Sequence, residues 1–269
     1  INLGKAVPEQ VLERLIPIQV RMLDNVIDLN TIDVKQATIT NKKYRAIGLG
    51  TFGWHHLLAL KGIKWETQEA VSFADELYEE IAMLTIKASI ELAKEKGAYP
   101  AFRESEWQTG EYFRQRGYLD GPRAVEWNVI ANDASAGMRN GYLMAVAPNS
   151  STSVIAGSTA SIDPIFKPFY YEEKKDYKLP VAAPDLDHRT YDVYRRSAYI
   201  VDQRWSLNQN AARQKHIDQS ISFNFYVPNH IKAQVLLDLH LQAWDSGLKT
   251  TYYVRSTASD IEDCVWCES

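Results

Sequence analysis

The sequence predicts an α/β protein, because segments with the apolar spacing of helices alternate along it with short strand-like runs. Residues 67–96 carry apolar side chains at steps of three and four, which is the spacing of one face of a helix. Three short runs rich in β-branched and aromatic residues are typical of strands. Segments with helical spacing separate these runs, and such alternation favours an α/β fold.

The expected helices differ in how clearly they begin and end. Residues 8–28 have helical spacing, but Pro17 interrupts them, so we expect either a kink or a second helix there. The helix over 67–96 has Thr67 as its N-cap and Gly97 placed to end it. Two further segments have helical spacing: residues 189–214 and 231–245.

The expected strands are short and lie in the second half of the chain: Tyr142–Ala147, Ile221–Tyr226 and Lys249–Val254. Residues 165–190 contain several prolines and a charge run, so we expect an irregular surface excursion there. After Tyr253 the apolar pattern stops, which predicts a folded domain over residues 1–255 and a mobile, polar tail over 256–269.

Composition excludes several classes of protein. The 269 residues are 45% hydrophobic, which is enough for a core, and their net charge of −4 argues against broad nucleic-acid binding. No apolar run is long enough to cross a membrane and no signal-peptide pattern is present, so we expect a cytoplasmic location. Only two cysteines occur, which excludes a disulfide scaffold.

Two familiar patterns are interpreted as structural. Gly48, Gly50 and Gly53 match the dinucleotide-binding pattern GxGxxG, but the run before them is short and polar. We therefore interpret these glycines as allowing a turn to pack closely before a helix. The six histidines do not have the spacing of a metal site, so no metal site is expected.

A serine-rich segment follows the first expected strand. It consists of Pro148, Asn149, Ser150, Ser151 and Thr152. Hydroxyl groups and free backbone N–H groups at the start of a helix can bind an anion. The alternative from local sequence is an N-cap loop with surplus serines. No lysine follows, so this is not a nucleotide-binding P-loop.

Two residue pairs near the C-terminus are candidates for redox chemistry. Tyr252 and Tyr253 are adjacent in an expected strand, so one side chain should face inward and the other outward. The alternative is an ordinary strand in a tyrosine-rich chain. Cys264 and Cys267 form a CxxC motif, whose spacing suits reversible disulfide chemistry or half of a metal site.

The chain resembles the large subunit of class I ribonucleotide reductases, in segments distributed in family order over nearly its whole length. These segments include residues 1–4, 45–50, 87–95, 148–153, 161–164, 217–222, 247–250, the tyrosine pair and the cysteine tail. The resemblance implies the second half of a ten-stranded α/β barrel of two five-stranded halves, with helices outside. It also implies reduction of ribonucleotides at the 2′ carbon through a thiyl radical.

The resemblance implies a role for each candidate group. Pro148 to Thr152 would bind the substrate's phosphates, which favours the anion site over the surplus-serine alternative. Tyr253, nearer a small subunit, and Tyr252, nearer the thiyl cysteine, would relay a radical. Cys264 and Cys267 would reduce an active-site disulfide, and thioredoxin or glutaredoxin would then reduce this cysteine pair again.

The resemblance also implies what this chain needs from outside. The thiyl cysteine, its neighbouring catalytic residues, the active-site disulfide and the regulatory elements would lie upstream of Ile1. We therefore expect an N-terminal half of the large subunit and a radical-generating small subunit as partners. The metal–radical cofactor is expected in that small subunit, and none is expected in this chain. Two alternatives are a non-catalytic half that docks the small subunit and a stand-alone CxxC thiol oxidoreductase.

Overall fold

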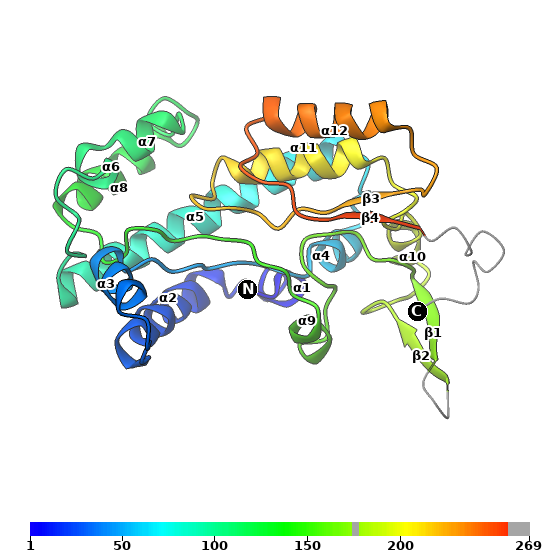
Figure 1. The fold of residues 1–269 in the computed structure, drawn as a ribbon, viewed down its shortest axis with the longest axis horizontal. Helices are drawn as coiled ribbons and strands as arrows, with labels where there is room; N and C mark the ends of the chain where they lie inside the picture. The colour runs from blue at the N-terminus through cyan, green and yellow to red at the C-terminus, as the bar shows by residue number, and fades with distance from the viewer. Residues whose placement is uncertain (174–177, 258–269) are drawn as a thin grey trace.

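Helices supply most of the regular structure in the computed structural model, which describes residues 1–173 and 178–257 (Figure 1). In chain order the elements are α1 (Leu3–Ala6), α2 (Leu12–Leu29), α3 (Lys35–Tyr44), α4 (Trp54–Lys61), α5 (Gln68–Lys96), α6 (Glu106–Thr109), α7 (Glu111–Gln115), α8 (Ala124–Ala136), α9 (Ser151–Ile155), β1 (Phe169–Glu173), β2 (Lys178–Ala182), α10 (Tyr191–Tyr194), α11 (Gln203–Gln214), β3 (Phe225–Val227), α12 (Ala233–Asp245) and β4 (Val254–Ser256). Among the described residues, no helix is both long and apolar enough to cross a membrane.

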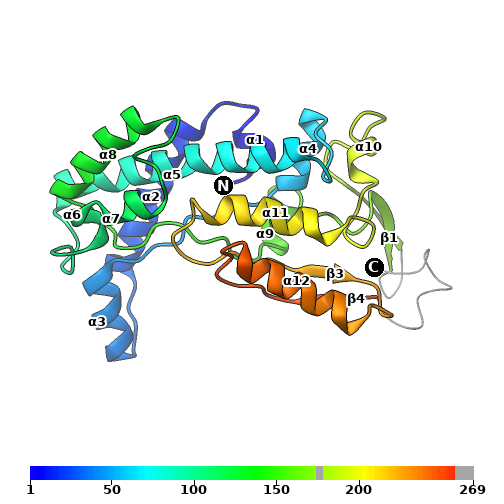
Figure 2. The ribbon, with the colours of Figure 1, turned by 90° about the horizontal axis from the view of Figure 1, so that it is seen from above.

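The long helix α5 organises the helical part of the molecule. It begins where the sequence predicts, because the Thr67 side chain accepts a hydrogen bond from the Ala70 N–H at 3.2 Å. It ends before Gly97, whose φ of 83° suits glycine. The helix packs against both α2 and α11, and Figure 2 shows α5, α11 and α12 side by side. Helix α2 continues through Pro17, so a second helix does not start there.

Five extended segments lie side by side and run in parallel. Isolated bridges join Asn2 to Phe52, Leu49 to Met144 and Val146 to Ile221, and β3 pairs with β4. Backbone hydrogen bonds hold neighbouring segments together, among them Leu49 N to Leu143 O at 2.8 Å and Ser222 N to Val146 O at 2.7 Å. Within the described residues these segments form an open parallel layer of an α/β fold and not a closed barrel.

Close contact between these segments explains the glycines of the GxGxxG pattern. A Cβ atom on Gly50 would lie 2.4 Å from the Ala145 carbonyl oxygen on the neighbouring segment. Gly53 has a φ of 80°, and a Cβ there would lie 2.3 Å from Ser158 Oγ. Helix α4 begins immediately afterwards at Trp54. The geometry agrees with glycines that allow close packing before a helix.

The three predicted strands are extended, but their regular parts are shorter or displaced. Residues 142–147 carry only single bridges, at Met144 and Val146. The second run becomes regular only at β3, and the third only at β4, which begins at the last residue of the predicted strand. Each segment pairs over only a few residues, because its partners change along its length.

The surface excursion predicted over 165–190 is not irregular throughout, because β1 and β2 form an antiparallel pair within it. Pro180 lies inside β2, opposite Tyr171. A proline lacks the N–H donor, but it is tolerated in a strand with an unpaired edge. The two-stranded sheet of β1 and β2 provides such an edge.

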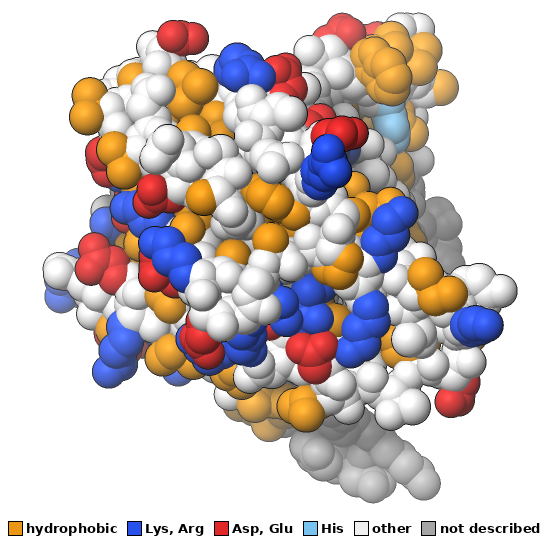
Figure 3. Space-filling model, turned by 90° about the vertical axis from the view of Figure 1, so that its left-hand side faces the viewer, with side chains coloured by type: hydrophobic (Ala, Val, Ile, Leu, Met, Phe, Trp, Pro, Cys, Tyr) orange, Lys and Arg blue, Asp and Glu red, His pale blue; other side chains and the backbone are white. Residues whose placement is uncertain are grey.

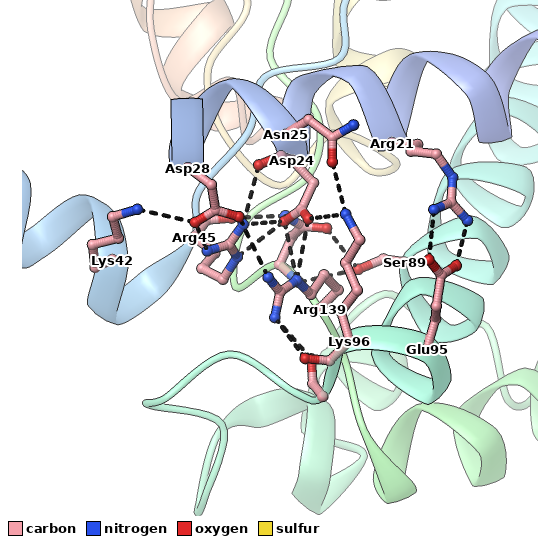
Figure 4. Close-up of polar contacts among 12 residues, drawn as sticks. Arg21, Asp24, Asn25, Asp28, Lys42, Arg45, Ser89, Glu95, Lys96 and Arg139 are labelled. Carbon is pink, nitrogen blue, oxygen red and sulfur yellow. Dashed lines mark hydrogen bonds and ion pairs between the residues drawn. The ribbon is translucent and has the colours of Figure 1, made fainter. Parts of the chain in front are cut away.

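A buried cluster of charges connects α2, α5 and the segment after α8 (Figure 4). The Asp24 side chain is fully buried, and its carboxylate accepts from Arg45 at 2.8 Å and Arg139 at 3.2 Å. Lys96 Nζ lies 3.5 Å from the same carboxylate. The Arg45 guanidinium also bonds Asp28 and holds the pKa of that carboxyl well below its usual range. Charges paired in this way avoid the cost of isolated burial.

The end of the molecule that is on the left in Figure 1 mixes charges of both signs (Figure 3). Lysine and arginine side chains alternate with aspartate and glutamate across this face. Such mixing is typical of an ordinary solvated surface, whereas nucleic-acid-binding faces carry a basic stripe.

Candidate functional site

A cavity of about 440 Å³ lies where three of the parallel segments meet. Its walls are residues 145–148, 219–222 and 250–252. Pro148, at the start of the serine-rich segment, and Tyr252, of the tyrosine pair, both line it. The structure therefore brings together one member of each of two predicted groups that are far apart in the sequence, whereas residues 149–152 and Tyr253 do not line this cavity.

The serine-rich segment leads into the short helix α9. Its first N–H groups have no partner within the helix, and Ser150 makes no side-chain cap. The side chains of Ser150, Ser151 and Thr152 are exposed. Asn149 is held in place, since its N–H donates to Ser161 Oγ at 3.0 Å and its carbonyl accepts from Ser161 N at 3.2 Å. The segment thus exposes hydroxyl groups and unpaired backbone N–H groups, while Asn149 at its start is fixed by Ser161.

Tyr252 and Tyr253 contact each other directly. Their ring centroids are 4.1 Å apart, and the Tyr252 hydroxyl donates to the Tyr253 hydroxyl oxygen at 3.3 Å. Each residue is 51% exposed. This hydrogen bond raises the pKa of Tyr252 above its ordinary value, because it stabilises the protonated phenol.

The prediction that one ring faces inward and the other outward is wrong. Phe225 pairs with Val254, so in a regular parallel ladder the Tyr253 N–H would donate to the Phe223 carbonyl. Instead, the Tyr252 N–H donates to the Phe223 carbonyl oxygen at 2.7 Å. Phe225 N donates to Tyr253 O at 2.9 Å, as in a regular ladder. One extra residue is therefore inserted, as in a β-bulge, and a bulge re-aims side chains.

The remaining candidates are Cys264 and Cys267, which lie outside the described residues.

In the part of the chain that the structure describes, no group of three His, Cys, Asp or Glu side chains could hold a metal ion. His55 is buried, and burial lowers its pKa to about 3. Its Nδ1 accepts from Ile165 N at 3.0 Å, so this histidine has a structural role.

Sequence reasoning gave no role to Asp163 or Asn224, which lie behind the tyrosine pair. Both are buried, and the Asn224 side chain donates to Asp163 at 2.6 Å. The available signals were weak: an aspartate before a proline, and an asparagine inside an otherwise β-rich run.

Comparison with known proteins gives a consistent result. The model of the family described as "Ribonucleotide reductase, barrel domain" matches residues 1–254. The ribonucleoside-diphosphate reductase subunit alpha of Treponema pallidum (strain Nichols) is 47% identical over 262 residues, covering 97% of this chain and 30% of the relative.

More distant relatives carry the same description. The ribonucleoside-diphosphate reductase subunit alpha of Helicobacter pylori (strain ATCC 700392 / 26695) is 39% identical over 276 residues, covering 98% of this chain and 35% of the relative. The ribonucleoside-diphosphate reductase subunit alpha of Bacillus subtilis (strain 168) is 28% identical over 290 residues, covering 99% of this chain and 41% of the relative. The chain thus spans about a third of the length of the first two relatives.

Proposed function

The chain belongs to the family of the ribonucleotide reductase barrel domain, and from that premise we propose that it forms part of the catalytic subunit of a ribonucleoside-diphosphate reductase. The whole enzyme would make deoxyribonucleotides from ribonucleotides by thiyl-radical chemistry. One observation carries the proposal: Pro148 and Tyr252 line the same cavity. A substrate held by its phosphates at the serine-rich segment would then lie beside the end of a radical relay.

In this proposal the serine-rich segment binds the substrate's phosphates. The exposed hydroxyls and the unpaired N–H groups at the start of α9 are donors of the kind that phosphate oxygens accept. Asn149 anchors the segment through Ser161, so little ordering would be needed on binding. The net charge of the segment's own residues is zero, so backbone and hydroxyl donors would do the binding.

Tyr252 and Tyr253 would relay the radical by transfer of hydrogen atoms. Tyr253 loses an electron and a proton towards the small subunit, whose metal–radical cofactor supplies the oxidant. The hydrogen atom of the Tyr252 hydroxyl then moves across the 3.3 Å contact to the Tyr253 oxygen, leaving the radical on Tyr252. Tyr252 in turn takes a hydrogen atom from the thiol of an upstream cysteine, which becomes the thiyl radical. The direction of the hydrogen bond, from Tyr252 to Tyr253, suits this order.

The other parts of the enzyme would be supplied from outside this chain. We propose that an N-terminal half provides the thiyl cysteine, the active-site disulfide and the other five strands of a ten-stranded barrel. Unpaired edges of the parallel layer are suited to such an addition. Cys264 and Cys267 would exchange electrons with that disulfide and be re-reduced by thioredoxin or glutaredoxin.

The test is to combine the intact catalytic subunit with its radical-bearing small subunit and to measure deoxyribonucleotide formation. We expect Tyr252→Phe to abolish turnover, because phenylalanine cannot release a hydrogen atom. Tyr191→Phe is the matched control, since Tyr191 is also 51% exposed but lies in α10. Undiminished activity of Tyr252→Phe would contradict the relay.

The same experiment separates the two alternative functions. A docking half without catalytic function predicts that substitutions of the tyrosines leave activity unchanged as long as the small subunit still binds. A stand-alone thiol oxidoreductase predicts disulfide reduction that requires Cys264 and Cys267 but neither tyrosine. Loss of deoxyribonucleotide formation in Tyr252→Phe, with small-subunit binding retained, excludes both.

A further inference from the structure

The bulge at Tyr253 leaves its backbone N–H without a ladder partner, and a side chain fills that place. The Asn224 Oδ1 accepts from Tyr253 N at 3.2 Å. Asn224 is 6% exposed, so water is not a ready substitute for this acceptor. Besides the ladder bonds of Tyr252 N and Tyr253 O, this amide group thus fixes the backbone of the tyrosine pair.

Asp163 fixes the orientation of that amide. Its Oδ2 accepts from Asn224 Nδ2 at 2.6 Å and from the Tyr226 hydroxyl at 3.1 Å. Because the carboxylate accepts the Nδ2 donor, the Asn224 oxygen must turn the other way, towards Tyr253. The Tyr226 hydroxyl holds the carboxylate from a second side, and Tyr226 N is itself bonded to Gln203 at 3.1 Å. Every polar group in this chain of contacts is satisfied.

The turn that carries Asp163 also holds the serine-rich segment. Ser161, two residues earlier, has a φ of 53° and bonds Asn149 in both directions. The left-handed conformation is unusual for serine and needs the surrounding contacts to hold it. One turn therefore contacts the base of the proposed phosphate site on one side and the bulge of the tyrosine pair on the other.

A buried carboxylate is costly, and an apolar side chain of similar size would fill the same space without that cost. Burial raises the pKa of Asp163 to about 6, which is one measure of this cost. Among the described residues the Asp163 carboxylate is held by hydrogen bonds and not by an ion pair, and the charge of Arg255 only partly offsets the effect of burial on its pKa. Its two described partners are the amide of Asn224 and the phenol of Tyr226, and through Asn224 it reaches the tyrosine pair.

We propose that Asp163 and Asn224 are positioning residues, which hold the Tyr253 backbone in its bulge and fix the tyrosine pair relative to the serine-rich segment. This inference rests on the proposed function for its effect on turnover. Neither residue would touch the substrate or carry the radical. They act by keeping the two phenols in contact with each other and Tyr252 at the cavity.

The test compares variants in the intact catalytic subunit. Asn224→Leu removes the acceptor for Tyr253 N while keeping a side chain of similar size. Asn210→Leu is the matched control, because Asn210 is a buried asparagine in α11 that bonds Ser206 and Arg213 and does not contact the tyrosines. Asp163→Leu and Asp163→Asn form a second pair, since asparagine keeps an acceptor oxygen and leucine does not.

Two measurements separate positioning from general stability. Amide hydrogen exchange at Tyr253 should become about tenfold faster in Asn224→Leu, which removes the acceptor, and in Asp163→Leu, which frees the Asn224 amide to turn away. Asn210→Leu does neither and should leave the exchange unchanged. With the small subunit added, kcat should fall by about 10- to 100-fold in those two variants, because misplaced reacting groups are that costly. KM for the ribonucleotide should stay within about twofold, and Asp163→Asn should recover most of kcat.

The outcomes distinguish failure of this inference from failure of the proposed function. Equal effects of Asn210→Leu and Asn224→Leu on kcat and on exchange would overturn the positioning role. Unchanged exchange at Tyr253 in Asn224→Leu would also overturn it, whatever the activity. If exchange responds as expected but Tyr252→Phe keeps full activity, the positioning contact is real and the radical-relay function is wrong.

Discussion

The Tyr252 hydroxyl donates a hydrogen bond to the Tyr253 hydroxyl at 3.3 Å, although neighbouring strand residues normally face opposite sides. A one-residue bulge makes this contact possible, because it interrupts the alternation between the two residues. Two phenols in contact can exchange a hydrogen atom without any movement of the backbone. Rings on opposite faces of a strand would have no such contact.

This contact predicts a change in the titration of Tyr252. Tyr253→Phe removes the acceptor of the hydrogen bond that stabilises the protonated Tyr252 phenol, so the pKa of Tyr252 should fall towards its ordinary value. NMR titration of ring-labelled tyrosine measures it directly. Tyr191→Phe should leave the Tyr252 titration unchanged. A Tyr252 pKa that does not move in Tyr253→Phe would mean that the two hydroxyls are not bonded in solution.

Local patterns predicted the elements whose structure is decided locally. Helix α5 follows its predicted limits closely, because an apolar stripe, an N-cap threonine and a terminal glycine all act within a few residues of each other. The hairpin of β1 and β2 was missed because Pro180 lies inside it, and Pro168 and Pro184 lie on either side. Pro180 is compatible with a strand only because β2 has a free edge, which is a property of the sheet and not of the segment.

The site was predicted as separate groups, and its assembly was not. No local signal places Pro148 beside Tyr252, because their proximity depends on the parallel pairing of three distant segments. The bulge was not predicted either. In it the Asn224 side chain accepts the hydrogen bond of the Tyr253 N–H, which a backbone carbonyl would accept in a regular ladder. A single asparagine or aspartate forms no repeating pattern in a sequence. The role of Asn224 and Asp163 can therefore be recognised only from their contact in the folded protein.

The cysteine pair predicts a split between single and repeated turnover. Cys264→Ser and Cys267→Ser leave the proposed phosphate and relay groups intact, so the first round of ribonucleotide reduction should proceed. Repeated turnover driven by a thioredoxin-type dithiol should be lost, because serine cannot exchange disulfides. Product formed per enzyme in rapid-quench and steady-state assays measures both. Full steady-state activity in either variant would contradict the proposed exchange role.

The buried charge cluster predicts a large loss of stability when Asp24 is replaced. Asp24→Asn removes the fully buried carboxylate that Arg45 and Arg139 share, and these two largely buried side chains keep only the partly exposed Asp28 as a common partner. We expect a loss of about 3–5 kcal/mol in the free energy of unfolding. Urea denaturation of the intact subunit measures it.

The control for this prediction is an ion pair on the surface. Glu95 bonds Arg21 at 2.5 Å, and both side chains are about half exposed to solvent. Solvent screening makes such pairs worth little, so Glu95→Gln should leave the free energy of unfolding almost unchanged. Equal losses in Asp24→Asn and Glu95→Gln would show that burial of the Asp24 cluster has no special energetic role.

The buried carboxyl of Asp163 predicts how stability changes with pH. Its pKa is about 6 in the folded protein, against an ordinary value of 3.8 in the unfolded chain. Between these values the folded state holds a proton that the unfolded state has released, so the free energy of unfolding falls as pH rises. The total fall from this group is of order 3 kcal/mol, and it is complete about one pH unit above the folded-state pKa of about 6.

Asp163→Asn isolates this contribution, because asparagine does not titrate. The difference in unfolding free energy, wild type minus Asp163→Asn, should decrease from about pH 4 to about pH 7 and stay constant above. His55 acts in the opposite direction, since its lowered pKa makes stability rise with pH over the same range. It is present in both proteins, so its effect cancels in the difference. Parallel stability curves from pH 4 to 7 would mean that Asp163 is not buried as a carboxyl with a raised pKa.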